Sequence, residues 1–236
     1  MIEMDGVATD SRHPRADPAR PAHAAPTRPA RAERRAERAE QRRTDLVLAA
    51  YDLVITRGFR AIGVNDIAQA AQVSHGTFYN YFDNKRDILD AVIDHCFDLL
   101  RDRLLGPEGD GRPESLEEFC DRYARVIDRC FELVATEPGL VNFFLLEASS
   151  IDDRVIDRCL HNARRYGVEA VARVSHGIGR GYLDPALDVD IAGEVLMSVL
   201  VSALLAALRG SSEGLTQDRV RTQLVGFLAS ALGAQS

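Results

Sequence analysis

The sequence predicts an all-α protein, and three observations lead to this expectation. Apolar residues recur at the three- and four-residue spacing of amphipathic helices through most of the chain. The alternation of apolar and polar residues that marks a half-buried strand is found nowhere. Side chains that cap helix N-termini stand where several helical patterns begin, and glycines stand where several end. We therefore expect about nine helices, arranged as a three-helix N-terminal unit followed by a larger helical unit.

The elements follow in order along the chain. The Arg-rich segment 31–43 is free of Gly and Pro and leads into a first amphipathic helix that ends at Gly58. Gly106–Pro113 is a loop by its glycines and prolines. Residues 1–30 hold five of the nine prolines and too few apolar residues to offset ordering entropy, so we expect them to be disordered. The other helices are expected at about 64–71, 75–82, 85–105, 115–135, 139–149, 152–180, 189–208 and 216–232.

The formal net charge of −7 is divided unevenly along the chain. Residues 28–90 carry ten Arg and one Lys against nine acidic residues, a net charge of +2, and residues 1–27 carry −1. The remaining residues, 91–236, therefore carry −8. This asymmetry indicates one part that faces phosphate and another with a different task. No uninterrupted apolar run reaches the roughly 18 residues of a membrane span, and no apolar signal-peptide core is present, so a cytoplasmic protein is expected.

The sequence holds no recognisable catalytic or metal-binding constellation. G-x-S-x-G, H-E-x-x-H and P-loop patterns are absent. The four cysteines form no C-x-x-C pair and lie in helical segments, so we interpret them as small buried side chains. The predictions are therefore no enzyme activity, no metal and no cofactor.

Two short helices joined at Gln72-Val73 and flanked by longer ones predict a helix-turn-helix, whose second helix enters the DNA major groove. Ser74 is a good N-cap for that second helix, and Phe78 and Phe82 are spaced as its inward anchors. Gly76 in its first turn lowers helix propensity by roughly 1 kcal/mol. A surface that must approach base edges closely gives a reason for that glycine. The alternative is a short exposed turn in an ordinary helical bundle.

Four stretches of this region resemble the signature of the tetracycline-repressor (TetR) family: Gly58-Phe59, Val64–Ala68, Ala71–Phe82 and Lys85–Leu89. The resemblance covers about residues 40–90 and has many correctly spaced positions without gaps. Two positions depart from the family pattern. Gly63 stands where Ser or Thr usually caps the second helix, and Gln72 stands where the turn usually carries Gly. A left-handed Gln72 would cost roughly 1 kcal/mol.

The resemblance implies that His75, Gly76 and Thr77 face base edges and that Tyr79, Tyr81 and Lys85, the only lysine, contact phosphates. Residues 44–90 carry only four cations against six Asp, so the Arg31–Arg43 segment is expected to add phosphate contacts or to enter the minor groove. The alternative is a solvated helix with internal Glu–Arg pairs. The candidate DNA-contacting residues are Arg38, Arg42, Arg43, Asn65, Ser74, His75, Gly76, Thr77, Tyr79, Asn80, Tyr81 and Lys85.

The resemblance divides the chain into a disordered arm (1–30), a DNA-binding domain with a basic extension (31–90) and a ligand-binding and dimerisation domain (91–236). The last two helices are too apolar for one buried side only, which independently favours a homodimer. The alternative is an ordinary core within a single chain. Candidate interface residues are Val195, Val199, Ser202, Ala203, Ala206, Leu224, Phe227 and Leu228. Candidate pocket residues are Phe97, Phe119, Tyr123, Phe143, Phe144, His161, Arg164, Tyr166 and Met197.

These features predict a sequence-specific DNA-binding regulator, a repressor released from a palindromic operator by a small hydrophobic or amphipathic ligand. The expected partners are double-stranded DNA, a second copy of the chain and an unidentified effector. The alternative is a helical protein–protein adaptor that does not bind DNA specifically. That reading leaves the basic segment and the polar second helix unexplained.

Overall fold

The computed structural model describes residues 28–106, 111–210 and 214–234, with backbone only at residues 28–31, 149 and 166. Within these residues every regular element is helical apart from one isolated β-bridge, Leu183–Gly233, so the all-α prediction is confirmed. The predicted disordered arm lies outside the described residues except for 28–30, which are helical. Pro29 stands in the first turn of that helix, where the missing N–H costs no hydrogen bond.

The helix bounds agree with the sequence patterns to within one or two residues at most ends, and α4 matches at both ends. Three short elements, η1 (Phe59–Ala61), η2 (Phe143–Glu147) and η3 (Ala148–Ser150), complete the order. The nine α-helices of the described residues are α1 (Arg28–Arg57), α2 (Val64–Ala70), α3 (His75–Phe78), α4 (Lys85–Leu105), α5 (Leu116–Thr136), α6 (Pro138–Asn142), α7 (Asp153–Arg180), α8 (Val189–Arg209) and α9 (Gln217–Leu232).

Two helices are shorter than predicted. The prediction 75–82 is wrong after Phe78, because the next amides, of Asn80 and Tyr81, donate three residues back rather than four and tighten the chain into a turn. The prediction of one α-helix over 139–149 is also wrong. The chain there changes from α6 to the π-helical turn η2 and then to the 3₁₀ turn η3. The first departure places Tyr79 and Tyr81 in the turn after α3, and the second places Phe143 and Phe144 in η2.

The chain forms two units, which meet between Glu40 and Gln41 within α1. The described part of the first unit is the helical segment 28–40, whose side chains from Ala32 onward are exposed. In the second unit, the C-terminal half of α1 packs with α2, α3 and α4 around Leu46, Ile67 and Phe78. The same apolar core continues along α4 into α5 and α6, so α2 and α3 share a core with the rest of this unit.

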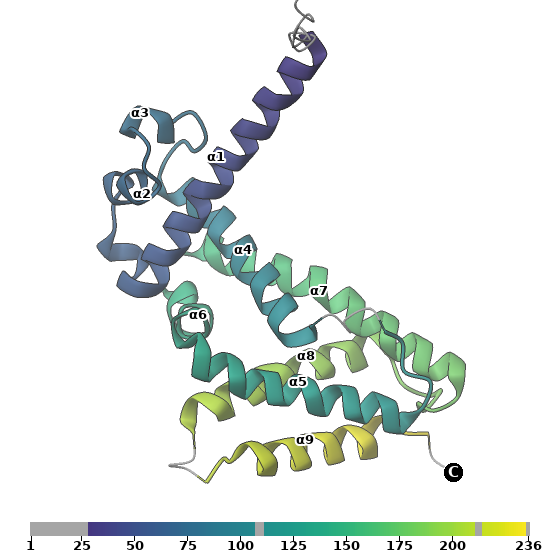
Figure 1. The fold of residues 1–236 in the computed structure, drawn as a ribbon. Helices are drawn as coiled ribbons and strands as arrows, with labels where there is room; N and C mark the ends of the chain where they lie inside the picture. Colours follow the sequence, from purple (N-terminus) through teal and green to yellow (C-terminus); the bar gives the residue numbers. More distant parts are fainter. Residues whose placement is uncertain (1–27, 107–110, 211–213, 235–236) are drawn as a thin grey trace, which may run out of the picture. The chain divides into compact units, whose positions relative to one another are not determined.

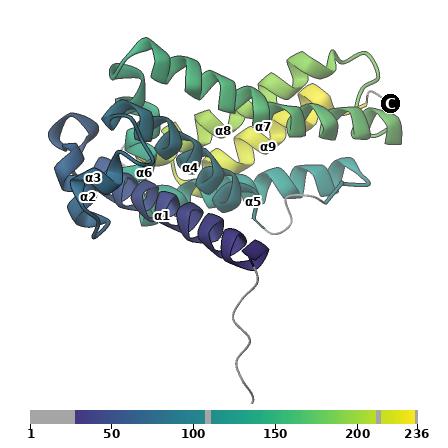
Figure 2. The ribbon, with the colours of Figure 1, turned by 90° about the horizontal axis from the view of Figure 1, so that it is seen from above.

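The helices α5, α8 and α9 run side by side, and α7 covers α8 from the other side (Figures 1 and 2). By length and composition α8 is apolar enough to cross a membrane. Of its most apolar stretch, 33% is buried within the protein. The sequence search for uninterrupted apolar runs missed this, because single acidic residues interrupt the run at Asp190 and Glu194. Packing on α5, α7 and α9 gives one side of α8 its apolar partners, and the other side stays exposed.

Candidate DNA-binding surface and effector pocket

The turn between α2 and α3 is strained at one residue. Gln72 has a φ of 55° and is the one non-glycine residue with positive φ in the described chain. A side chain in this left-handed conformation costs roughly 1–2 kcal/mol. The turn is held by the amide of Val73, which donates to the carbonyl of Ala68 at 2.9 Å. The expected helix-turn-helix geometry is therefore present, with Gln72 where glycine would relax it.

Each short helix begins with a distinct cap. The amide of Gly63 donates to the carboxylate of Asp66 at 2.7 Å, so Asp66 compensates for the side chain that Gly63 lacks. Ser74 Oγ accepts the amide of Thr77 at 3.0 Å, and the two hydroxyls of this pair lie 2.8 Å apart. The hydroxyl of Thr77 thus already has a partner within the helix.

The outer face of α3 is small and polar. Phe78 is fully buried and fixes the helix on the core, with its ring 5.8 Å from that of Phe82. Of the candidate DNA contacts, Asn65, Ser74, His75, Gly76, Tyr79 and Asn80 are exposed, and Thr77 and Tyr81 are half-buried.

Gly76 has no internal reason to be a glycine. Its φ is not positive, and a Cβ built there would have Ser74 Oγ at 3.9 Å as its nearest neighbour. The protein would therefore accommodate alanine, which is the better helix former. The missing side chain leaves room on the outside of the helix.

The ammonium of Lys85 is bound within the protein. Nζ donates to the carbonyls of Phe59 at 2.6 Å and Ile62 at 2.8 Å and lies 4.1 Å from the centre of the Phe59 ring. Burial lowers the pKa of Lys85. This side chain therefore ties η1 to the start of α4. The phosphate contact implied by the family resemblance stays a prediction.

The other cations of residues 44–90 also have partners inside the protein. Arg57 lies 3.6 Å from the carboxylate of Asp66, and Arg60 donates to the carbonyl of Ser150 at 2.7 Å. Arg86 binds Asp90 and, at 2.9 Å, Asp152. The cations of α1 are therefore better candidates for phosphate contacts than those of residues 44–90.

Two sets of arginines stand on α1. Arg43 stacks on the ring of Phe82 with 5.1 Å between the guanidinium carbon and the ring centroid, so it braces the turn after α3. The side chains of Arg34, Arg35, Arg38 and Arg42 are exposed. The role of Arg38 and Arg42 in DNA binding stays a prediction.

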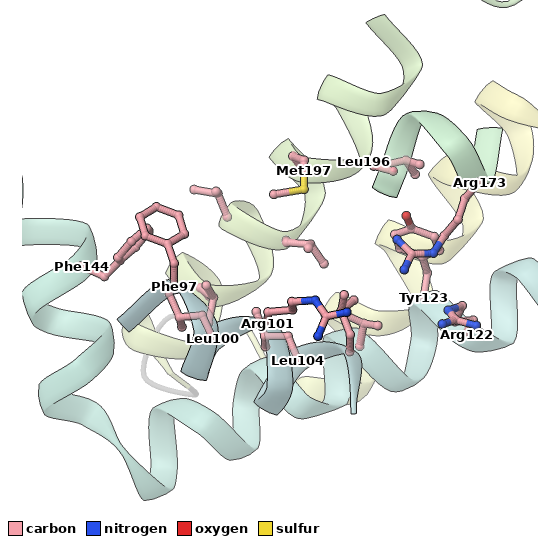
Figure 3. A pocket seen from close by; sticks show the side chains of 16 residues that line it. Phe97, Leu100, Arg101, Leu104, Arg122, Tyr123, Phe144, Arg173, Leu196 and Met197 are labelled. Atoms are coloured by element: carbon pink, nitrogen blue, oxygen red, sulfur yellow. The ribbon is translucent and has the colours of Figure 1, made fainter. Parts of the chain in front are cut away.

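A cavity of about 120 Å³ lies among α4, α5, α7 and α8 and touches η2 (Figure 3). The engineered protein cavity that binds benzene, at about 150 Å³, is of similar size. Twelve of its lining side chains are apolar, and the remaining four are Tyr123 and three arginines. Its lining residues are Phe97, Leu100, Arg101, Leu104, Leu105, Arg122, Tyr123, Val126, Phe144, Ala170, Arg173, Leu196, Met197, Leu200, Val201 and Leu204.

Four of the predicted pocket residues line this cavity: Phe97, Tyr123, Phe144 and Met197. Phe119 and Phe143 were wrong, because both are fully buried in the core and do not reach the cavity. His161 and Arg164 were wrong as well, since they are exposed on α7 and absent from the cavity wall. The side chain of Tyr166 lies outside the described residues. The three arginines were missed.

The exposed face of α8 and α9 is the candidate dimer surface. Ser202 and Phe227 are exposed, the latter at 56% of its surface. Val195, Ala206 and Leu224 are half-buried. Val199, Ala203 and Leu228 were wrong, because they are buried within the chain's own core. The exposed residues that replace them are Ile191, Val201 and Leu205 on α8 and Gly226, Ser230 and Ala231 on α9.

The cysteines are unpaired thiols. Cys96 and Cys130 are buried, which raises the pKa of each to about 12, and Cys120 and Cys159 are half-buried. In the described part of the chain, no three His, Cys, Asp or Glu side chains are grouped so that they could hold a metal ion.

Comparison with known proteins identifies the N-terminal region. A sequence profile of bacterial regulatory proteins of the tetR family matches residues 46–92. The HTH-type transcriptional regulator YdeS of Bacillus subtilis (strain 168), described as uncharacterized, is 26% identical over 150 residues, which cover 62% of this chain and 70% of that protein. The HTH-type transcriptional repressor Rv3405c of Mycobacterium tuberculosis (strain H37Rv) is 35% identical over 90 residues, which cover 38% of this chain but only 46% of that protein.

Solved structures extend the likeness of fold to the C-terminal helices. The transcriptional regulator FadR from Bacillus subtilis, solved in complex with stearoyl-CoA, superimposes with a TM-score of 0.61 at 20% identity, covering 79% of this chain and 97% of that one. The profile match lies on the helix-turn-helix described above, and the relatives are HTH-type regulators. Residues 46–92 therefore form a helix-turn-helix domain of the tetR family, and the chain is similar to HTH-type transcription regulators.

Proposed function

We propose that this chain is a dimeric repressor that binds a palindromic operator through α3 and is released by a small ligand bound in the cavity of Figure 3. The observation that carries the DNA-binding part is the exposed, small and polar face of α3, with a glycine that the fold itself does not need. The name of the mycobacterial relative supports repression, and the stearoyl-CoA complex of FadR supports an amphipathic ligand. Residues 31–90 would form the DNA-binding part and 91–236 the effector and dimerisation part.

Substituting Gly76 tests the DNA-binding surface. We expect Gly76→Ala to raise the free energy of unfolding by up to about 1 kcal/mol, because alanine fits and favours the helix. Operator affinity should fall at least tenfold, because in each subunit the added methyl keeps the helix from the base edges. The measurements are urea denaturation and gel shift on the DNA upstream of the chain's own coding region.

The matched control for this test is Gly179→Ala. Gly179 is an exposed glycine on α7, where an added Cβ also meets nothing within 4 Å. This variant should gain stability and keep full operator affinity. A Gly76→Ala protein that binds the operator as tightly as the wild type would contradict the proposed surface.

The dimer is proposed to form through the outer faces of α8 and α9. The exposed residues Ile191, Val201 and Leu205 recur on one side of α8, and Phe227 stands among small residues on α9. An added Cβ at Gly226 meets nothing within 4 Å, so a partner helix has room to approach. A palindromic operator needs such two-fold symmetry, since one short helix contacts few bases.

Charging the centre of this face should separate the subunits. Phe227→Asp is expected to give a monomer at micromolar concentration in sedimentation and to lose operator binding with its fold intact, because a carboxylate would be buried without a partner. The control is Val168→Asp on α7, which removes a side chain that is even more exposed, at 66%. A Phe227→Asp dimer would rule out this interface.

The release step is proposed to run through two contacts at the start of α7. Phe144 and Phe97 bring η2 and α4 to the cavity. The chain leaves η2 through η3, where the carbonyl of Ser150 binds Arg60, and then reaches Asp152, which binds Arg86 at the start of α4. A ligand that shifts η2 or α4 thus changes the position of the helix-turn-helix relative to α7. This shifts the population of DNA-binding conformers.

Asp152→Asn tests this coupling. Asp152 also caps α7 by accepting the amide of Val155, and asparagine caps equally well but lacks the charge that holds Arg86. With 1-anilinonaphthalene-8-sulfonate as a fluorescent probe of the cavity, operator DNA should weaken probe binding less in the variant, by about threefold to tenfold. Asp188→Asn, at the cap of α8, is the control. Equal coupling in both variants would refute the route.

A further inference from the structure

Two tyrosines that pack on the same core ring differ in their hydrogen bonding. Tyr123 and Tyr182 both lie against Phe119, with ring centroids 4.9 and 6.2 Å from it. The hydroxyl of Tyr182 donates to the carbonyl of Pro113 at 3.1 Å. The hydroxyl of Tyr123 has no hydrogen-bond partner among the described residues, although only 5% of this residue is exposed. Tyr123 therefore carries a polar group, withdrawn from solvent, that the fold itself does not satisfy.

This hydroxyl borders the cavity. In the part of the chain that the structure describes, every fully enclosed side-chain oxygen or nitrogen has a hydrogen-bond partner. Because the hydroxyl of Tyr123 has none, it must touch open space, and the space that Tyr123 lines is the cavity. Figure 3 shows Tyr123 at the same end of the cavity as Arg122 and Arg173. A molecule in the cavity can therefore supply the missing partner.

The arginines of the cavity wall have partners within the protein. Arg101 binds both Glu169 and Asp102, at 3.2 and 3.3 Å. Arg173 also binds Glu169, at 3.4 Å, and Arg122 donates to a backbone carbonyl at 2.6 Å. These contacts are made without any charge on a ligand. An ion would lose its hydration among the apolar side chains that form most of the wall, so the cavity favours an uncharged occupant.

The polar groups of the cavity wall are hydrogen-bond donors. Burial raises the pKa of Tyr123 to about 12, so its phenol keeps its proton at physiological pH. A phenol can donate and accept, but the ring draws electron density from the oxygen and makes it the better donor. The other polar lining side chains are guanidinium groups, which have no acceptor atom. An oxygen acceptor on the ligand therefore suits this wall.

We propose that the effector is an uncharged, largely apolar molecule whose ketone, ester or ether oxygen accepts a hydrogen bond from the hydroxyl of Tyr123. This deepens the proposed function and rests on the cavity being the effector site. The twelve apolar side chains of the wall surround the rest of the molecule. The volume of about 120 Å³ limits that apolar part to about one ring or a short chain, unless the helices move apart.

Calorimetric titration of the full-length protein with one-ring probes tests the class of ligand. Acetophenone carries a carbonyl acceptor and no charge, whereas benzoate and benzylammonium carry opposite charges on a ring of the same size. We expect acetophenone to bind ten times or more tighter than either ion, because both ions lose more hydration in the cavity. Benzoate or benzylammonium binding as tightly as acetophenone, or no binding of acetophenone, would overturn the proposal.

Tyr123→Phe tests the residue, because it removes only the hydroxyl. Acetophenone should bind about threefold to tenfold more weakly, the effect of losing one hydrogen bond between neutral groups. Ethylbenzene, which has nearly the same shape and no acceptor, should bind as tightly as before or more tightly. The matched control is Tyr182→Phe, since Tyr182 does not line the cavity and should leave both affinities unchanged. An unchanged ratio of the two affinities in Tyr123→Phe would overturn the assignment.

Thermal unfolding without ligand gives a second, independent measurement. Tyr123→Phe should keep or raise the Tm, because its hydroxyl contributes no hydrogen bond to the fold. Tyr182→Phe should lower the Tm, because it removes the donor to Pro113. A fall in Tyr123→Phe as large as that in Tyr182→Phe would mean that the hydroxyl is already satisfied within the protein, and would overturn the proposal.

A gel shift with the same probes separates this inference from the proposed function. If acetophenone binds through Tyr123 but leaves the operator complex intact, the acceptor site stands and ligand-induced release fails. If acetophenone and ethylbenzene release the operator equally, in Tyr123→Phe as in the wild type, release stands and the contact with Tyr123 fails.

Discussion

Phe78→Ala is expected to lower the free energy of unfolding by about 3–5 kcal/mol, the largest effect of any single change at the DNA-binding surface. Phe78 is fully buried, and it is the one residue of α3 that enters the core. A helix of four residues has almost no stability of its own, so its position depends on this anchor. Urea denaturation followed by circular dichroism measures the loss, and operator binding should disappear with it.

The neighbouring residue provides the contrast. Tyr79 is 48% exposed, and Tyr79→Ala should change stability by less than about 1 kcal/mol while it weakens operator binding. The two adjacent aromatic residues would then separate the support of the surface from the surface itself. Equal loss of stability in both variants would contradict the assignment of Phe78 as the anchor.

Deleting residues 1–38 is expected to weaken operator binding and to flatten its dependence on salt. The cations of residues 44–90 all have partners within the protein, whereas Arg34, Arg35 and Arg38 are exposed. Each phosphate contact contributes about 0.9 to the slope of log affinity against log salt. Losing two contacts in each subunit of a dimer would reduce the slope by about 3.6 and cost several orders of magnitude in affinity at low salt.

Replacing Arg34, Arg35 and Arg38 together with Gln distinguishes charge from length, because the helix keeps its residues and loses three cations. Its salt slope should approach that of the deletion. Gel shifts at several salt concentrations measure both proteins. An unchanged slope would mean that these arginines are solvated and pair with the glutamates of their own helix.

Helices with local signals at both ends could be predicted closely from the sequence. At α4, Asn84 accepts the amides of Arg86 and Asp87 at 2.8 and 3.0 Å, and Gly106 ends the helix with a φ of 62°. Both signals are side-chain or backbone properties of single residues. The segment 138–150 has no such signal, because no side-chain cap hydrogen bond marks the start of α6, η2 or η3. The position of the π-helical turn could not be derived from spacing.

The candidate site residues divide in the same way, into those fixed by local signals and those fixed only by tertiary packing. The outer face of α3 was predicted because capping and the Phe78–Phe82 spacing fix its orientation. In the cavity the aromatic residues were partly found, but the arginines were not. Arginine is common on exposed helix faces, and only tertiary packing distinguishes the buried Arg122 from the exposed Arg164. On α8, apolar residues surround the helix, so the sequence alone could not tell Val199, which is buried, from Val201, which is exposed.

Lys85, which ties η1 to α4, is the only lysine in the 236 residues. Lysine acylation, whether by an enzyme or by a reagent, can therefore modify one ε-amine in this sequence. The acyl group would remove the charge and two of the three protons, so at most one of the carbonyls of Phe59 and Ile62 would keep its donor beside the helix-turn-helix. Because Nζ donates to both carbonyls, we expect this amine to react mainly when these hydrogen bonds open. The rate of acylation thus gives a direct measure of how often the DNA-binding region opens locally.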